Sequence, residues 1–146
     1  MKRERVRTLR GQIEVTAGGT GKQQIIVDDG LLNRGYKVIG FYVWENSGSP
    51  TQFNATLSML PSLAADDMDA SNNSQIGWVW QGSSTNGWSW KEYILDPDHI
   101  IVRDLYVTLK DAANDKYNFM VVVEQMSITP DEAIMSIIKE ESQGFD

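Results

Sequence analysis

The residue types that most often carry out chemistry are scarce in this chain. It contains no cysteine and one histidine, which excludes disulfides, thiolate metal sites, cysteine nucleophiles and any site that needs two imidazoles. The histidine, His99, follows Asp96-Pro97-Asp98, which is typical of a turn leading into a strand, and no Gly-x-Ser-x-Gly elbow supplies a nucleophile. We therefore interpret His99 as a structural or surface residue rather than as part of a catalytic triad.

A glycine-rich run at residues 17–23 has some features of a phosphate-binding loop. The first glycine of that motif would fall at Thr16, and Gln23 stands where a serine or threonine would follow Lys22. No helix pattern comes after it. The run instead predicts a tight turn between two strands.

Oxygen ligands for a cation gather in one acidic loop, where Asp66, Asp67 and Asp69 precede Asn72 and Asn73. The alternating ligand order of an EF-hand is absent. We interpret the stretch as a solvated loop and keep a weak cation site as the alternative. With no nucleophile, base and orienting group in a recognisable pattern, the sequence predicts no enzyme, no cofactor and no metal centre.

Four tryptophans form two pairs with strand spacing: Trp78 and Trp80, then Trp88 and Trp90. Residues two apart on a strand share a face. A loop centred on Ser84 would stack the two pairs across a hairpin, whereas a turn at Asn86-Gly87 would place Trp80 opposite Tyr93. A core or subunit interface is the common use of such residues. The alternative is an aromatic platform for sugar rings.

The elements that must position these residues are strands. At 146 residues, with 41% apolar and 23% charged residues, the chain fits one domain and has no apolar run near the roughly 18 residues of a membrane span. Period-two patterns predict eight strands, at residues 12–16, 22–27, 36–45, 53–60, 75–81, 87–95, 99–109 and 117–128. The fold class is therefore all-β, an antiparallel sandwich of about eight strands over residues 11–128.

The topology of the sandwich is less determined by the sequence. The cysteine pair of an immunoglobulin domain is impossible here, which favours a single jelly roll over an immunoglobulin-like sandwich. The turns predict hairpins between residues 12–16 and 22–27 and between residues 99–109 and 117–128.

The first ten residues carry an unusual concentration of positive charge. Five basic residues, Lys2, Arg3, Arg5, Arg7 and Arg10, stand against one glutamate, whereas the whole chain has a net charge of −7. Residues 1–10 therefore predict a basic N-terminal arm. Such an arm can contact nucleic acid weakly, reach an acidic neighbouring subunit, or keep the terminus soluble.

Residues 129–146 predict a short C-terminal helix and tail. Thr129 is a suitable N-cap, Pro130 suits the first helical position, and Glu132 completes a capping box. Ile134, Ile137 and Ile138 then form an apolar stripe. So short a helix needs a surface to pack on, in its own subunit or in a neighbour.

Several stretches resemble small virion structural proteins of marine viruses and bacteriophages: RVRTLRG at residues 5–11, LDPDHIIVRDLY at 95–106, YNFM at 117–120, TPDEA at 129–133 and IIKE at 137–140. The resemblance implies a jelly-roll capsid component, in the shell, at a vertex or as decoration. It implies a homo-oligomer that contacts other virion proteins through its body, arm and helix. The expected location is the virion, after synthesis in the host cytoplasm without a signal peptide. The alternative function is a carbohydrate-binding module.

Overall fold

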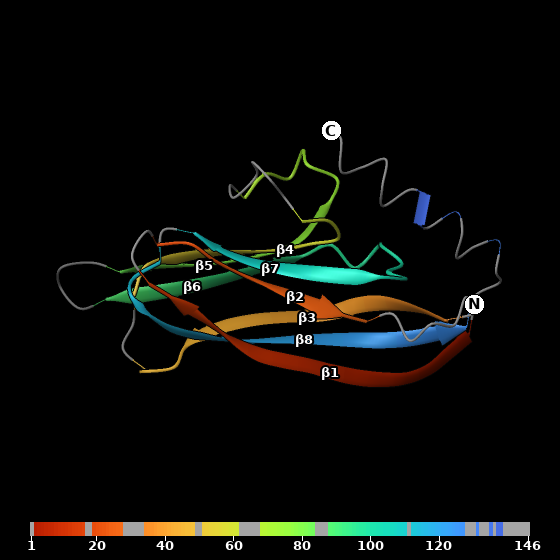
Figure 1. Ribbon diagram of the computed structural model, residues 1–146, viewed down its shortest axis with the longest axis horizontal. Coiled ribbons are helices and arrows are strands. Elements are labelled where there is room, and N and C mark those ends of the chain that lie inside the picture. The colour runs from red at the N-terminus through yellow and green to blue at the C-terminus, as the bar shows by residue number, and fades with distance from the viewer. Residues whose placement is uncertain are drawn as a thin grey trace.

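The computed structural model describes residues 2–16, 19–27, 34–48, 51–61, 68–83, 88–110 and 112–127, together with residues 131, 135, 137 and 138. Eight antiparallel strands lie in two sheets (Figure 1). The three-stranded sheet has the order β1–β8–β3 and the five-stranded sheet the order β2–β7–β4–β5–β6. The strands are β1 (Lys2–Val15), β2 (Gly21–Ile26), β3 (Arg34–Glu45), β4 (Phe53–Ser58), β5 (Gln75–Ser83), β6 (Ser89–Leu95), β7 (Asp104–Lys110) and β8 (Asp115–Ser127).

One hydrophobic core lies between the two sheets. Alternate residues of β8, including Phe119, Val121 and Val123, are buried against the same cluster as Leu105 and Leu109 of β7. Because strand side chains alternate between faces, the intervening residues of each strand point outward. Burial of each such side chain stabilises the fold by about 1.5–3 kcal/mol. The predicted all-β class and the predicted number of strands are confirmed, but the first strand begins at Lys2 rather than at residue 12.

The pairing of the strands differs from the expectation. β1 pairs with β8 along its whole length, and β7 pairs with β2 and β4, so both predicted hairpins, β1 with β2 and β7 with β8, are wrong. In each case the chain reverses direction but crosses to the opposite sheet. Glycine-rich and acidic turns indicate a reversal, but they do not determine which sheet the next strand joins.

The predicted seventh strand begins too early. Residues 96–103 run irregularly, apart from one bridge in which Ile101 and Tyr36 exchange backbone hydrogen bonds of 2.7 and 2.9 Å. Regular pairing starts only at Asp104. Ile101 and Val102 are nevertheless buried, so their apolar character reflects packing rather than strand position.

The predicted C-terminal helix falls mostly outside the described residues. Residues 131, 135, 137 and 138 have helical backbone, and Ile137 packs against Val102. Ile138 is exposed, and Ile134 lies outside the described residues. A continuous helix stays a prediction. In the described part of the chain, no helix is long and apolar enough to cross a membrane.

Candidate functional site

The basic run lies within β1 rather than apart from the body. Residues 2–10 pair with β8, from Lys2 opposite Ser127 to Arg10 opposite Met120, with a bulge between Arg3 and Arg5. β8 is long enough to offer backbone hydrogen bonds over this whole stretch, which explains the difference from the predicted arm. The side chains of Lys2 and Arg3 are not among those described.

Two of the arginines contact the body of the protein. The Arg5 Nε atom donates a hydrogen bond of 2.7 Å to the Gln125 side-chain oxygen. One terminal nitrogen of Arg7 lies 3.2 Å from the Tyr36 hydroxyl, and its guanidinium lies 5.7 Å from the centre of the Tyr36 ring. Arg10 is exposed. Arg5 and Arg7 therefore help hold the N-terminal half of β1 in place.

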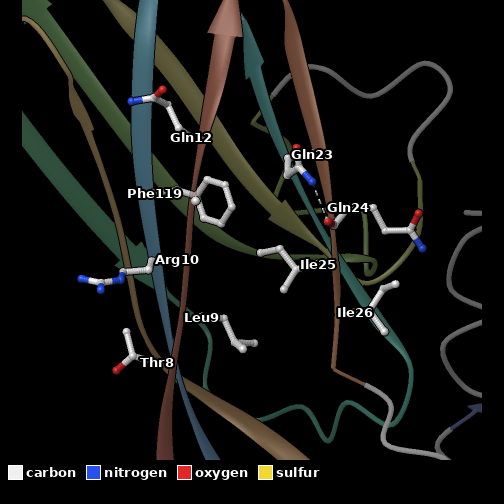
Figure 2. A pocket seen from close by; sticks show the side chains of 10 residues that line it. Thr8, Leu9, Arg10, Gln12, Gln23, Gln24, Ile25, Ile26 and Phe119 are labelled. Carbon is white, nitrogen blue, oxygen red and sulfur yellow. Dashed lines mark hydrogen bonds between the residues drawn. The ribbon is translucent and has the colours of Figure 1, made fainter.

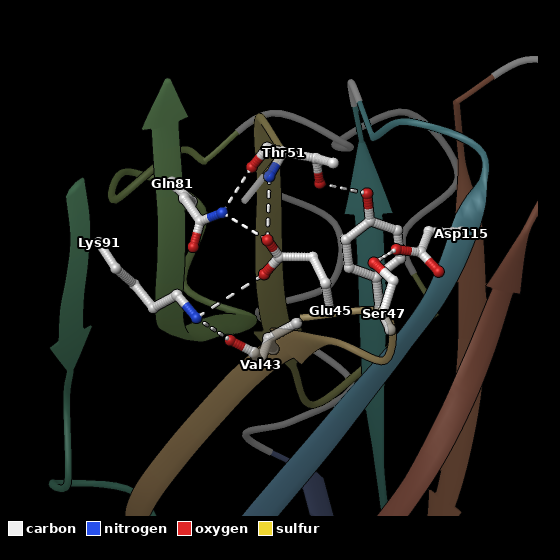
Figure 3. Close-up of polar contacts among 8 residues, drawn as sticks. Val43, Glu45, Ser47, Thr51, Gln81, Lys91 and Asp115 are labelled. Atoms are coloured by element: carbon white, nitrogen blue, oxygen red, sulfur yellow. Dashed lines mark hydrogen bonds and ion pairs between the residues drawn. The ribbon is translucent and has the colours of Figure 1, made fainter. Parts of the chain in front are cut away.

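A buried carboxylate connects the two sheets at one end of the core (Figure 3). Glu45 of β3 accepts hydrogen bonds of 2.7 Å from the Gln81 side chain of β5 and 2.9 Å from the Thr51 backbone. Its other oxygen lies 4.0 Å from the Lys91 Nζ atom of β6. Gln81 also donates to the Thr51 carbonyl oxygen at 2.7 Å.

Lys91 and Tyr117 extend this polar cluster. Lys91 donates to the Val43 carbonyl oxygen at 3.0 Å, and burial lowers the pKa of its ammonium, an effect that Glu45 partly offsets. The Tyr117 hydroxyl lies 2.8 Å from the Thr51 hydroxyl, and burial raises the pKa of that phenol. Because each contact joins elements of different sheets or loops, we interpret the cluster as an inter-sheet clasp.

This clasp is not predicted from the sequence. Its only sequence signal is position: Glu45 follows the inward-facing residues Phe41 and Val43, and Gln81 follows inward-facing Val79. A charged or amide side chain at an inward position predicts a buried polar partner.

The tryptophan hairpin forms, but in neither predicted register. Gly82 lies opposite Trp90, Trp80 opposite Glu92 and Trp78 opposite Ile94. Opposed residues share a face, so Trp78, Trp80 and Trp90 all lie on the outer face of the five-stranded sheet. The Trp90 ring covers Gly82, where an added Cβ would lie 2.1 Å from the indole.

A small apolar pocket lies beside two of these tryptophans. It has a volume of about 270 Å³ and is lined by Met68, Ala70, Trp78, Trp80 and Ile94. The Trp78 indole N–H donates to the Gln75 side chain at 2.9 Å, so the ring is fixed in orientation. Trp90 is 52% exposed, and Trp88, just before β6, is exposed further.

A groove opens between the edge strands β1 and β2 (Figure 2). Its volume is about 620 Å³, and Leu9, Ile25 and Phe119 lie between the two strands as its apolar part. Beyond β1, the bulge at Arg3 and Arg5 and the charged side chains discourage a further strand from pairing.

The remaining predicted residues have local partners. His99 Nε2 lies 3.0 Å from Asp96, whose pKa is lowered mainly by the backbone N–H of Asp98, with a smaller contribution from His99. Asp69 accepts hydrogen bonds from the Ser71 backbone and hydroxyl, which lower its pKa. Asp66 and Asp67 lie outside the described residues, and among those described no three His, Asp or Glu side chains form a metal-binding group.

Comparisons with protein families, with curated proteins and with solved structures find no match to this chain.

Proposed function

We propose that the chain is a virion structural protein, a capsid-associated subunit with the topology of a single jelly roll. In a jelly roll, strands pair first with eighth, second with seventh, third with sixth and fourth with fifth. Three of these pairs are present here: β1 with β8, β2 with β7, and β4 with β5. This strand order is the observation that carries the proposal.

The third and sixth strands do not form the pair that they would form in a jelly roll, but they still lie next to each other. β6 pairs with β5 and not with β3. The two strands nevertheless meet at the edge, where the Tyr42 and Tyr93 rings lie 5.5 Å apart. The sandwich is thus closed on this side by side chains instead of a ladder.

A rigid two-sheet body with the Glu45 clasp suits a subunit that must keep its shape in an assembly. In this proposal the body supplies the subunit contacts, and the C-terminal residues add a second contact. Arg10 and the neighbouring basic residues contribute weak, salt-dependent attraction to acidic subunits or to nucleic acid.

The test is the mass of the purified full chain in solution, by light scattering after size exclusion at low and high salt. We expect a closed oligomer or larger particles, which negative-stain microscopy would display. A 16.4 kDa monomer at every concentration and salt would contradict the proposal.

A second candidate function, a carbohydrate-binding module, is favoured by one observation. Trp78, Trp80 and Trp90 share an outer face, beside a pocket that two of them line. Sugar binding would quench or shift tryptophan fluorescence, and Trp80→Ala and Trp90→Ala would abolish the change. A fluorescence spectrum that no glycan of a broad panel alters would contradict this function.

A further inference from the structure

The outer face of the three-stranded sheet carries large apolar side chains in contact with solvent. Val6 of β1 is 44% exposed, and Tyr42 and Trp44 of β3 are 39% and 40% exposed. Between them, Met120 and Val122 of β8 are only half-buried. We call this set, with the outward-facing residues around it, the β8 face. In Figure 1 the sheet that carries it forms one outer layer of the molecule.

The outer face of the other sheet is different. Its outward-facing residues Thr56, Ser58 and Thr108 are buried, at 2–3% exposure, so its centre is already covered by the chain itself. Contiguous exposed apolar side chains on a sheet indicate a contact surface. The centre of the three-stranded sheet therefore lacks the cover that the β4–β7 centre of the other sheet has, whereas the exposed Trp90 and Ile94 of that other sheet lie toward its β6 edge.

The two charges on the central strand of the β8 face have a symmetric arrangement. The outward-facing residues of its central strand run from Lys116 through Asn118, Met120 and Val122 to Glu124. If two copies pack face to face with their β8 strands antiparallel and Met120 on the axis, Lys116 of each copy lies opposite Glu124 of the other. The same symmetry places Trp44, which is level with Asn118, opposite Gly40, which is level with Val122.

The size of the face fits a weak but specific dimer. Three strands about 4.8 Å apart and about ten residues long, at about 3.4 Å per residue, present on the order of 500 Å². Two copies together then bury about 1,000 Å², which is the area of a weak interface and less than the roughly 1,200–2,000 Å² of a stable one. An apolar centre with charges at both ends is also the usual anatomy of such an interface.

We propose that the β8 face packs against the same face of a second copy of this chain, around a two-fold axis near Met120. This inference rests on the proposed function as an assembling subunit and names the surface that one of its contacts uses. Arg10 lies level with Met120 on β1, so the same axis brings Arg10 of the two copies to the same level at the exposed rim of the interface.

The first test uses sedimentation equilibrium of Met120→Lys and Trp44→Thr, with Trp90→Thr as the matched control on the other sheet. We expect the dimer dissociation constant to rise at least tenfold for the first two variants and to stay within about twofold for the control, since 1.4 kcal/mol corresponds to tenfold. Circular dichroism and thermal unfolding verify that each variant is folded.

A charge exchange tests the symmetry itself. Lys116→Glu and Glu124→Lys should each weaken the dimer, and the double variant should restore it to within about threefold of the original. If all these variants assemble as the original chain does, the β8 face is not the contact surface, and only the proposal of a virion structural protein remains. A wild-type chain that stays monomeric would overturn both.

Discussion

Glu45 is a buried charged residue on β3, a strand whose other inward-facing side chains are apolar or aromatic. It occupies an inward position beside Phe41 and Val43, and it is stabilised there by Thr51, Gln81 and Lys91. A buried carboxylate is tolerated only with such partners, because an unpaired buried charge is very costly.

Replacing this carboxylate tests the clasp. Glu45→Ala removes the acceptor of the Gln81 amide and of the Thr51 backbone N–H, together with the negative charge beside Lys91, and we expect a loss of about 2 kcal/mol or more in the free energy of unfolding. Glu45→Gln keeps an acceptor oxygen and should cost less. Urea unfolding measures both variants, and equal stability of the two would show that the hydrogen bonds of Glu45 are unimportant.

Gly82 is required by the ring that covers it. In Gly82→Ala the new methyl group would collide with Trp90, and we expect a loss of about 1 kcal/mol as the half-exposed indole moves aside. In a Trp90→Ala background the same change should be neutral or stabilising, because alanine suits a strand better than glycine. A double-mutant cycle by urea unfolding gives the coupling, and an absent coupling would contradict this explanation.

Asp115 provides a test by pH. The Ser47 hydroxyl, and next the Lys116 backbone N–H, hold the pKa of Asp115 below its ordinary value of 3.8. The unfolded chain therefore takes up this proton first as the pH falls, so the stabilisation is complete above the unfolded pKa and is lost as the pH falls through the folded pKa.

Ser47→Ala should move the pKa of Asp115 upward, toward 3.8. Protonation of Asp115 at low pH should then lower the free energy of unfolding by less than it does in the original chain. An NMR titration of the carboxyl carbon measures the change. Ser71→Ala is the matched control, because it acts on Asp69 in the same way and should leave Asp115 unaltered.

At the scale of elements, the basic residues near the N-terminus belong to β1, a strand paired with β8. Eight of its residues between Lys2 and Arg10, all but Glu4 at the bulge, pair with β8 as an edge strand. A bulge and several arginines on an edge are known protections against pairing with other chains. The charge that predicts a separate arm thus also suits a strand that must remain an edge.

Deletion of residues 1–10 should therefore destabilise the body. Each backbone hydrogen bond contributes about 0.5–1.5 kcal/mol net, so the loss amounts to several kcal/mol and leaves much of β8 as a new edge. Thermal unfolding and hydrogen exchange of β8 measure the effect. A truncated chain with unaltered stability and protection would favour the separate arm.

The strands themselves are predictable from the sequence, whereas their partners are not. Alternation placed β3, β4 and β5 within two residues of their observed bounds, because burial of one face dictates the pattern. The hairpins predicted across residues 17–23 and 111–115 do not form. Turn residues determine where the chain reverses, but the sheet that the next strand joins depends on distant strands. The observed β5–β6 register also differs from both predictions, and it places the Trp90 ring over Gly82, a contact that the spacing of the tryptophans does not indicate.

At the scale of the whole molecule, the topology predicts slow folding. The first strand pairs with the last, and the second with the seventh, so most of the sheet is made of pairs far apart in sequence. Such non-local topologies fold in milliseconds to seconds. Stopped-flow refolding followed by tryptophan fluorescence measures this rate, and refolding within microseconds would contradict the observed pairing.

The same pairing sets an order of events on the ribosome. β1 is synthesised before the other seven strands, whereas its partner β8 is synthesised last of the eight. Until then the emerging polypeptide holds an unpaired strand whose arginines keep it in water. The β1–β8–β3 sheet can therefore close only after β8, the last of the eight strands, has been synthesised.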